Sequence, residues 1–254
     1  MNENKNDEFA SLQLEGRRAV QEALNRGRQI DKILIRKGEI EGTLKIIVAK
    51  AREQGVVVQQ VDKNRLDTVA HNERHQGIIA LCPAHDYADP EEFLSAAAEK
   101  GEDPFVLILD GITDTHNLGA MIRSAEACGV HGVVIHKRRA ASLTGVVSKA
   151  AAGALAYMPV ARVTNIAETI ESFKKRGLWI ACADMKGKPI YKADLKGPLA
   201  LVIGEEGQGV SRLVQSKCDF AVSIPMYGQI PSLNASVAAG ILMYEVARRR
   251  RAAE

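Results

Sequence analysis

The stretch FVLILDGITDTHNLGAMIRSAEACGVHGVVIH, residues 105–136, carries the pattern that decides the fold. It begins with the apolar run Phe105–Leu109 and closes with a second one, Val133–Ile135. The residues between them predict a helix over about 117–128, because small and apolar side chains recur there at helical spacing. Apolar runs without polar alternation are typical of strands buried on both faces of a parallel sheet. The stretch therefore predicts an α/β fold.

The same alternation continues toward the C-terminus. Further strands are predicted at 155–160, 178–183, 199–204 and 220–226, and further helices at about 142–150, 165–176, 210–217 and 233–250. Sheets of this kind bind ligands beyond the carboxyl ends of their strands, in the loops that lead into helices. Taken alone, the pattern predicts an open, doubly wound sheet without a knot.

A smaller α/β domain is predicted ahead of this one, at residues 11–83. The segment GRRAVQEALNRG (16–27) predicts its first helix, with further helices near 42–54 and 64–70 and strands at 33–35, 56–61 and 78–82. Residues 84–104 contain prolines and many acidic side chains, so we interpret them as a linker with one helical turn. The polar residues 1–10 are expected to be disordered, and the second domain is expected to span 105–254.

Composition limits the class of protein. Of 254 residues, 46% are hydrophobic and 26% are charged, which is ordinary for a protein with packed cores. A net charge of +3 permits nucleic-acid binding without favouring it strongly. The four cysteines form no CxxC motif, the N-terminus does not resemble a signal peptide, and no apolar run approaches the ~18 residues of a membrane span. We therefore expect a soluble, reduced, cytoplasmic protein with no membrane partner.

Three polar loops follow predicted strands of the second domain. In the first, ITDTHNLGAMIR (112–123), Asn117 could cap the helix that then carries Gly119 and Arg123. A lone arginine on an apolar helix is usually a surface residue whose aliphatic stem covers its neighbours. At the carboxyl end of a strand it could instead bind a phosphate or carboxylate through paired hydrogen bonds. Both interpretations stay open on the pattern alone.

The second loop belongs to LALVIGEEGQGVSRL (199–213). Gly204, Gly207 and Gly209 would let the backbone approach a ligand closely, and Glu205 or Glu206 could accept hydrogen bonds. The order of the glycine spacings is reversed from the GxGxxG of dinucleotide-binding loops, which argues against a nucleotide-dependent oxidoreductase. A glycine-rich turn without a ligand is the plainer alternative.

The third loop, IPMYGQIPSLNAS (224–236), opens a long apolar helix. One capping residue would satisfy the free N–H groups of the first turn, yet Ser232, Asn234 and Ser236 all offer oxygens, with the apolar Leu233 among them. Because all three loops follow strands of one parallel sheet, we expect them to converge into a single cleft with an arginine, carboxylates and a Ser-Asn pair.

Two other features carry weaker signals. His71 and His75 are four residues apart, as a helical metal pair would be, but HNERH is not HExxH and no third ligand is evident, so no metal is expected. The run Arg248–Arg251 is most simply a solvated helix end, where cations are favourable beside the negative end of the helix dipole. It could also contact RNA phosphates.

The three loops resemble, in order and spacing, the motifs of SpoU-type RNA ribose 2′-O-methyltransferases of the SPOUT superfamily. The matching stretches are Asn117–Arg123, Val202–Gly209, and Ile224–Met226 with Ser232–Val237. The resemblance covers about residues 105–250. The first domain is similar, more loosely, to the L30e-like module that precedes this catalytic domain in the branch acting on large-subunit rRNA. The resemblance, and not the periodicity, implies a deep trefoil knot near the C-terminus and a homodimer that completes the cleft.

The resemblance also implies site residues. The methyl donor S-adenosylmethionine would lie against Ala183, Gly204, Ile224, Met226 and Leu233. The catalytic set would be Arg123, Asn117, Glu205, Ser232 and Asn234, with Arg123 at the reacting ribose and its phosphate. A guanidinium is effectively always protonated, so stabilisation of charge on the 2′-oxygen is easier to defend for Arg123 than proton abstraction; the proton acceptor stays open.

The implied reaction is 2′-O-methylation of a ribose in RNA, with a guanosine in the P loop of 23S rRNA as the expected substrate. A tRNA ribose is the nearest alternative, and a non-catalytic rRNA-binding assembly factor is another. The first domain would recognise folded RNA. Its expected RNA contacts, each more often an ordinary solvated charge, are Arg17, Arg18, Arg36, Lys37, Arg74 and His75.

Overall fold

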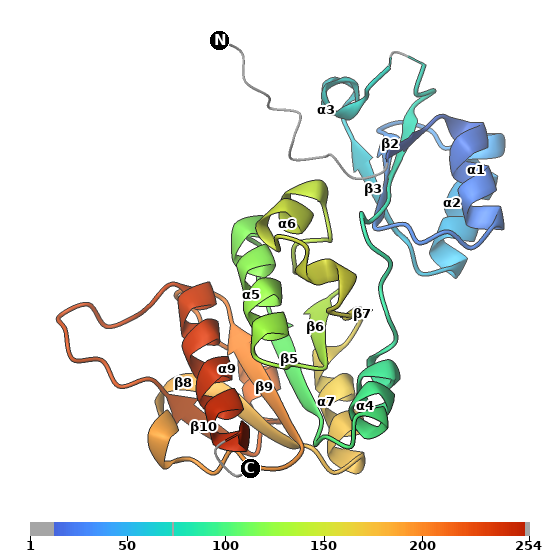
Figure 1. The fold of residues 1–254 in the computed structure, drawn as a ribbon. Coiled ribbons are helices and arrows are strands. Elements are labelled where there is room, and N and C mark those ends of the chain that lie inside the picture. The colour runs from blue at the N-terminus through green and yellow to red at the C-terminus, as the bar shows by residue number, and fades with distance from the viewer. Residues whose placement is uncertain (1–12, 73, 252–254) are drawn as a thin grey trace. The chain divides into compact units, whose positions relative to one another are not determined.

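A computed structural model describes residues 13–72 and 74–251, and the chain divides into two compact units. The first comprises residues up to Asp86 together with Ser142–Val146, and the second comprises Tyr87–Ala141 and the chain from Val147 onward. Figure 1 shows the order of their helices and strands. The expectation of disorder at residues 1–10 falls outside the described residues. Among the described residues, no helix combines the length and apolarity that crossing a bilayer requires.

The first unit is a four-stranded sheet with helices on both faces. Its strands are ordered β1-β4-β2-β3, with β2 and β3 parallel and the other pairs antiparallel. Because side chains alternate along a strand, Ile33 and Ile35 of β2 pack in one core and Leu34 packs in the other. The elements are β1 (Gln13–Glu15), α1 (Arg17–Asn25), β2 (Lys32–Arg36), α2 (Thr43–Glu53), β3 (Val57–Val61), α3 (Lys63–Val69) and β4 (Ile78–Leu81).

The second unit confirms the predicted parallel α/β fold. Its six strands are ordered β10-β8-β9-β5-β6-β7, and every neighbouring pair is parallel. The strands are β5 (Phe105–Asp110), β6 (Gly132–His136), β7 (Val160–Val163), β8 (Trp179–Pro189), β9 (Leu199–Gly204) and β10 (Phe220–Ser223). The central strand β5 is fully buried up to its final residue, as its apolar sequence predicts.

Helices cover both faces of this sheet. On one face, α5 (Thr115–Ala127) and α9 (Ala235–Arg251) lie side by side (Figure 1). The core on the other face is built with α4 (Pro90–Glu99), α7 (Ile166–Lys175) and α8 (Arg212–Gln215). The short helix α6 (Gly145–Ala150) follows the loop after β6.

The prediction of a strand at 155–160 is wrong, because the strand in this region starts only at the last of these residues. Residues Ala154–Ala156 form a short 3-10 turn, Tyr157 is exposed, and β7 starts only at Val160. Pro159 stands directly before that start, and a proline lacks the N–H that a strand would donate to its neighbour. The apolar run therefore spans a turn and the beginning of a strand.

The segment predicted as a linker, 84–104, contributes to the core of the second unit. Asp89 and Glu92 form a capping box around Pro90 that starts α4. Phe93 of this helix is fully buried over Gly132, where an added Cβ would lie 2.3 Å from the aromatic ring. Two residues before α4, the N–H of Ala88 donates to the carbonyl of Val160 over 2.9 Å. The second compact unit thus begins at Tyr87, and the start of the catalytic domain at residue 105 stays a prediction.

An irregularity separates the pairing of β10 with β8 into two parts. Ala221 lies opposite Cys182, but the next residue, Val222, lies opposite Lys188, so the residues between the two partners on β8 bulge out. A Cβ at Gly187 would lie 2.6 Å from the backbone nitrogen of Val222, which explains the glycine there. The trefoil knot implied by the resemblance stays a prediction.

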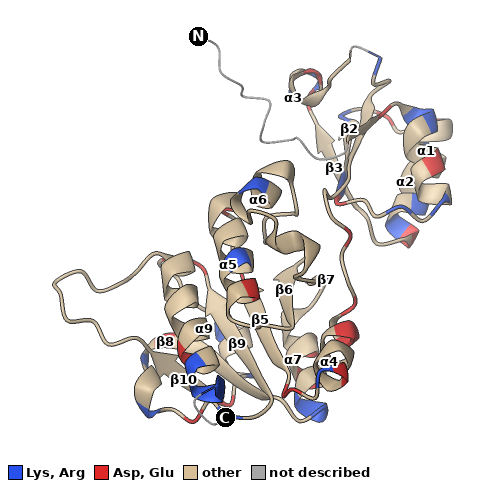
Figure 2. Ribbon diagram, in the orientation of Figure 1, with Lys and Arg blue, Asp and Glu red and all other residues tan. Residues whose placement is uncertain are grey.

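Figure 2 shows basic residues at the C-terminal end of α9, and two of these arginines bond to neighbouring segments of the second unit. The guanidinium of Arg250 donates to the carbonyl oxygens of Asp103, Pro104 and Gly197 and stacks 5.0 Å from the ring centroid of Phe105. Arg249 donates to Glu245 and to the carbonyls of Ala193 and Ile190. The expectation of a solvated helix end is wrong for these two residues, because their stems and heads pack on neighbouring elements.

Candidate functional site

The carboxyl ends of β5 and β9 meet at one edge of the sheet, where Asp110 lies opposite Gly204. The Asp110 carboxylate accepts a hydrogen bond from the N–H of Ser211 over 2.8 Å, and the N–H of Gly209 donates to the carbonyl of Glu205 over 2.8 Å. A Cβ at Gly204 would lie 2.0 Å from the carbonyl carbon of Gly209. The glycine-rich loop therefore folds back tightly on its own strand, which requires a glycine at position 204.

Asn234 joins two of the three polar loops to the start of α9. Its side-chain oxygen accepts hydrogen bonds from the N–H and hydroxyl of Ser236, over 2.9 and 2.6 Å, and from the N–H of Val237. Its side-chain nitrogen donates to Asn117 Oδ1 over 3.1 Å and to Glu206 Oε2 over 3.4 Å. One amide thus caps a helix and connects the loops after β5 and β9.

Asn117 lies in the first turn of α5, which holds it in place. Asp114 caps α5, because its carboxylate accepts a 2.7 Å hydrogen bond from the N–H of Asn117. Two residues later, a Cβ at Gly119 would lie 2.4 Å from Cβ of Ala150, so α5 and α6 touch at this glycine. Asp114 was not among the residues singled out from the sequence, although an aspartate three residues before Asn117 matches the spacing of a capping residue.

The other predicted catalytic residues lie near the same edge but do not join this network. Glu205 is exposed and lies beside Gly111, where a Cβ would be 3.5 Å from that of Glu205. Ser232 is exposed in the loop before α9. Arg123 is exposed on α5, and within the described part of the chain no hydrogen bond or ion pair holds its guanidinium. The structure therefore brings together Asn117, Asn234 and Glu206, and the roles of Glu205, Ser232 and Arg123 stay predictions.

The residues expected to contact the methyl donor come from the ends of three adjacent strands and from the loop before α9. Strands β10, β8 and β9 are neighbours, and Ala183, Gly204 and Ile224 stand at or just beyond the paired parts of these strands. Ile224 and Leu233 are half-buried and Met226 is exposed. Apolar side chains beside a glycine backbone suit an adenosyl group, because a flat base needs an apolar wall and hydrogen-bonding backbone groups.

In the first unit, three of the predicted RNA contacts gather at the start of α1. Arg18 and Arg74 line an open pocket of about 640 Å³, together with Gln76. The side-chain oxygen of Gln76 accepts a 3.2 Å hydrogen bond from the N–H of Arg17, and Gln76 itself has a φ of 52°. This arrangement holds the loop that carries Arg74 against the first turn of α1.

The remaining predicted RNA contacts have other surroundings. Arg36 is exposed, and Lys37 forms an exposed ion pair with Asp62 over 3.1 Å. His75 is buried: its Nε2 lies 3.0 Å from Asp67 and its Nδ1 accepts a hydrogen bond from the N–H of Gly77. Because both ring nitrogens have protein partners, His75 shapes its loop, and its contact with RNA stays a prediction.

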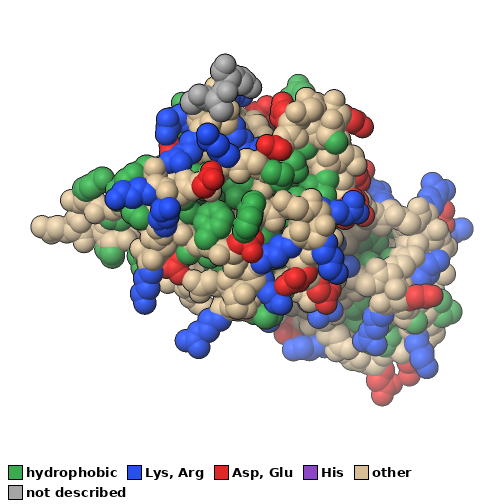
Figure 3. Space-filling model, turned by 90° about the horizontal axis from the view of Figure 1, so that it is seen from below, with side chains coloured by type: hydrophobic (Ala, Val, Ile, Leu, Met, Phe, Trp, Pro, Cys, Tyr) green, Lys and Arg blue, Asp and Glu red, His purple; other side chains and the backbone are tan. Residues whose placement is uncertain are grey.

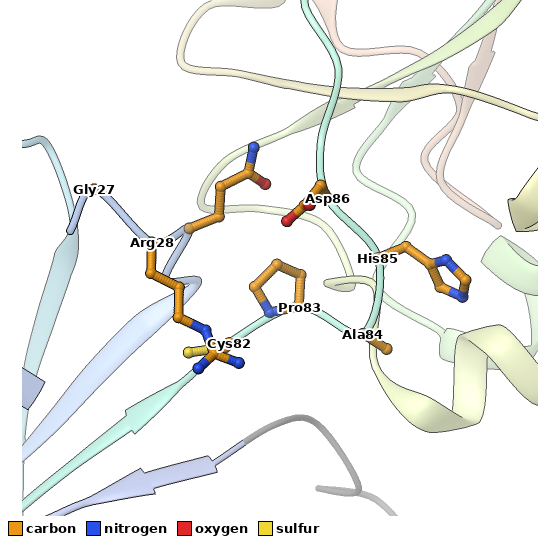
Figure 4. Close-up of a pocket in the computed structure, with 8 residues that line it drawn as sticks. Gly27, Arg28, Cys82, Pro83, Ala84, His85 and Asp86 are labelled. Carbon is orange, nitrogen blue, oxygen red and sulfur yellow. The ribbon is translucent and has the colours of Figure 1, made fainter. Parts of the chain in front are cut away.

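Figure 4 shows a further pocket of the first unit, about 710 Å³ in volume, that contains none of the predicted site residues. Arg28 and Asp86 face it from opposite sides, with Pro83 and Cys82 between them. Burial raises the pKa of the Cys82 thiol, while Arg28 opposes this shift. The thiol is therefore a poor nucleophile at neutral pH.

Metal ligands do not gather in the part of the chain that the structure describes: it contains no group of three or more His, Cys, Asp or Glu side chains arranged to hold an ion. His71 and His75, the pair noted in the sequence, turn to different carboxylates. His71 lies 3.5 Å from Glu15, and His75 pairs with Asp67.

Comparison with protein families agrees with this fold. Residues 104–244 match the model of the SpoU rRNA Methylase family, and residues 13–88 match that of the RNA 2′-O ribose methyltransferase substrate binding domain. The first match covers more than half of the chain. The chain belongs to the SpoU rRNA methylase family, and its class is that of the TrmH/SpoU RNA methyltransferases.

Individual relatives extend the similarity over both units. The chain is 46% identical over 236 residues to YacO of Bacillus subtilis (strain 168), assigned to the TrmH family of tRNA/rRNA methyltransferases, with 92% of this chain and 94% of that protein covered. It is 49% identical over 238 residues to a protein of Staphylococcus aureus (strain MSSA476) with the same family assignment, covering 92% and 95%.

Solved structures share the fold. The SpoU methyltransferase AviRb from Streptomyces viridochromogenes, solved with AdoMet, aligns with a TM-score of 0.59 at 24% identity, covering all of this chain and 95% of that one. The TrmH/SpoU tRNA modifying enzyme of A. aeolicus aligns with a TM-score of 0.54 at 29% identity, covering 64% of this chain and 85% of that one.

Proposed function

We propose that the protein transfers a methyl group from S-adenosylmethionine to the 2′-oxygen of a ribose in large-subunit rRNA, with a guanosine of the P loop as the target. The observation that carries this proposal is the hydrogen bonding of Asn234 to Asn117 and Glu206. It joins three loops at the ligand-binding edge of the sheet, in a chain of the SpoU family.

The donor site is assigned to the wall formed by Ala183, Gly204, Ile224, Met226 and Leu233. S-adenosylmethionine supplies a methyl group that is already activated by its positive sulfur. The protein must hold the ribose oxygen in line with that group and assist the loss of one proton. Asn234 positions the loops, and Glu205 and Ser232 are exposed beside them. Arg123 stabilises negative charge on the ribose oxygen and its phosphate.

A second copy of the chain is part of this proposal, because Arg123 has no partner among the described residues of its own chain. The face beside α9 exposes Tyr191, Tyr227, Ile241 and Tyr244 around an apolar hollow of about 620 Å³. Exposed apolar groups of this kind mark interaction surfaces. Figure 3 shows hydrophobic side chains among Lys and Arg on the face that it views.

Sedimentation tests the dimer. Tyr244→Asp should convert a dimer to a monomer, because it places a charge in the apolar contact, whereas Tyr157→Asp, at another exposed tyrosine, should leave the dimer intact. A wild-type protein that sediments as a monomer at micromolar concentration would contradict the dimer.

The reaction itself is tested by transfer of labelled methyl from S-adenosylmethionine to transcribed large-subunit rRNA, with bulk tRNA in parallel and the modified ribose mapped. Label at one 2′-oxygen of the rRNA is expected. Label on tRNA alone would support methyltransferase activity but contradict rRNA as the substrate. The relatives are named as tRNA/rRNA methyltransferases, so this outcome is worth testing.

Arg123→Ala separates an enzyme from a non-catalytic rRNA-binding assembly factor. The variant should lose methyl transfer by about 100-fold or more, the usual cost of removing a group that stabilises transition-state charge. Calorimetry should show that donor binding survives. A wild-type protein that binds donor and rRNA but transfers no methyl to rRNA, to tRNA or to ribosome precursors would support the assembly factor.

A further inference from the structure

A cluster of positive charge follows β6 in the second unit. Lys137, Arg138 and Arg139 come directly after the last residue of this strand, His136, and Arg162 lies on the neighbouring strand β7. In register, Arg162 stands opposite Ile135, one residue before the end of β6. We call Lys137, Arg138, Arg139 and Arg162 the basic cluster.

The backbone of this loop is fixed at several points. His136 Nδ1 accepts hydrogen bonds from the N–H groups of Arg138 and Arg139, over 2.9 and 3.2 Å. The N–H of Lys137 continues the ladder to β7 by donating to Val163 over 2.8 Å. At the far end of the loop, the N–H of Ala141 donates to the carbonyl of Ile112 over 2.9 Å. The basic side chains thus project from a held backbone, unlike those of an ordinary mobile surface loop.

The charges of the cluster are close together. Burial lowers the pKa of Lys137, and the nearby Arg162 and then Arg138 lower it further. Arg162 also stacks over the ring of Tyr87, with its guanidinium carbon 4.5 Å from the ring centroid. Across the described residues, Lys137, Arg138 and Arg139 take part in no ion pair with a carboxylate. Cations held together without carboxylate partners create a strong local field that favours an anion.

The cluster stands at the same sheet edge as the candidate site. Strand β5, which leads to Asn117, lies between β9 and β6, and all of these strands are parallel. Leu109 of β5 lies opposite Ile135 of β6, so the strand ends at Asp110 and His136 are neighbours. With about 4.8 Å between neighbouring strands, the ends of β6 and β7 lie roughly 10–14 Å from the end of β9. An RNA strand covers that distance within a few nucleotides.

We propose that the basic cluster binds backbone phosphates of the substrate RNA that flank the methylated ribose. This inference rests on the proposed function, since it places the target ribose at the loops joined by Asn234. Arginine and lysine bind phosphate through charge-assisted hydrogen bonds that carry no base identity. The cluster therefore holds the RNA in register over the second unit and leaves sequence recognition to other surfaces.

The test removes the charges of two arginines that have no role in the proposed catalytic or donor-binding sites. Arg138→Ala with Arg139→Ala leaves intact the two backbone N–H groups that bond to His136. The matched control is Lys175→Ala with Lys196→Ala, which removes two exposed charges at the opposite, amino edge of the same sheet. Binding of a transcribed large-subunit rRNA fragment is measured for each protein across a salt series.

The cluster variant is expected to bind the RNA roughly tenfold more weakly near 150 mM salt. The slope of log affinity against log salt should fall by about 1.4 to 1.8, as for two lost phosphate contacts. The control should keep the wild-type slope, and Arg138→Lys with Arg139→Lys should keep most of it. In methyl transfer, KM for RNA should rise while kcat at saturating RNA is retained.

Equal losses in the cluster variant and the control would overturn the inference, because they would show a general effect of net charge. An unchanged slope in the cluster variant would overturn it as well. Failure of the proposed function gives a different result, in which wild-type protein transfers no methyl group whatever its RNA affinity. Calorimetric binding of S-adenosylmethionine verifies that each variant is folded.

Discussion

Asn234 combines two tasks that usually belong to separate residues. Its oxygen caps α9, and its nitrogen connects the loops after β5 and β9. An asparagine is suited to both, because one end of its amide accepts hydrogen bonds and the other donates them. The position of the capping residue therefore also sets the position of the candidate site.

The two tasks can be separated by Asn234→Asp and Asn234→Ala. Aspartate keeps the capping oxygen, so thermal stability should stay close to wild type, whereas alanine should cost about 1 kcal/mol. Aspartate loses the donor nitrogen and places a second carboxylate beside Glu206, so methyl transfer should fall by tenfold or more in both variants. Denaturant unfolding and labelled methyl transfer measure the two effects. Full activity in the aspartate variant would contradict the proposal that the side-chain nitrogen of Asn234 is needed to connect the loops.

At the level of single residues, sequence reasoning found the loops better than the contacts within them. Asn117 and Asn234 are identifiable as polar residues near predicted helix starts after strands, and the structure joins them, although Asp114 and not Asn117 caps α5. The choice between Glu205 and Glu206 depends on how the glycine-rich loop folds back on Gly204, which spacing cannot reveal. His75 illustrates the converse, since a histidine beside an arginine in a polar loop gives no sign of its burial.

The final helix, α9, is fastened at its end by the side chains of its own last turn. Arg250 reaches three carbonyl oxygens from the loops that precede β5 and β9. Those oxygens belong to segments more than 50 residues earlier in the chain, so the helix end closes contacts across the whole second unit. A run of four arginines in sequence does not indicate which of them turn inward.

Arg250→Ala should lower the free energy of unfolding by about 2 kcal/mol or more. The variant loses hydrogen bonds from a charged donor and leaves the carbonyl oxygens without their partner. Arg251→Ala, at the exposed neighbouring arginine, should change stability by less than about 0.5 kcal/mol. Urea unfolding monitored by circular dichroism measures both changes in stability. Equal losses in the two variants would contradict the role of Arg250 in anchoring the helix.

Acidification should expose the contribution of Glu245 to this helix. Hydrogen bonds from Arg248 and then Arg249 lower the pKa of Glu245 to about 2. A carboxyl pKa lowered by folding stabilises the protein above the ordinary value of about 4.3, and this stabilisation disappears as pH falls toward 2. Because Arg248 is more than half exposed and solvent screens its charge, Glu245→Gln should be less stable than wild type at pH 6 by about 1 kcal/mol.

The pH series supplies the check on Glu245. The difference in unfolding free energy between wild type and Glu245→Gln should be constant from pH 6 to 5 and should shrink steadily between pH 4 and 2. A difference that stays the same over that range would show that the carboxylate charge contributes nothing to stability.

For the whole molecule, the boundary between the two units matters most. The alternation of apolar strands with helices was sufficient to predict a parallel sheet, but α4 was taken for part of a linker. Its amphipathic stretch is short, and the acidic residues around it are typical of a connecting segment. The sequence pattern does not reveal that Phe93 is buried, although this one aromatic side chain anchors the helix on the sheet.

Two fragments test the boundary. A fragment of residues 87–254 should fold cooperatively, because it retains α4, whereas a fragment of residues 105–254 should be less stable by about 3–5 kcal/mol or fail to fold. The full chain with Phe93→Ala should show a loss of similar size. Circular dichroism and denaturant unfolding compare them, and equal stability of the two fragments would place the boundary at residue 105 after all.

The contact between Phe93 and Gly132 limits how these two positions can change during evolution. No side chain fits at position 132 while a phenylalanine ring lies 2.3 Å from where its Cβ would be. A lineage can therefore gain an alanine at 132 only after residue 93 has become smaller, and it passes through a cavity on the way. The two positions should vary together among relatives, with the order of the changes imposed by the packing.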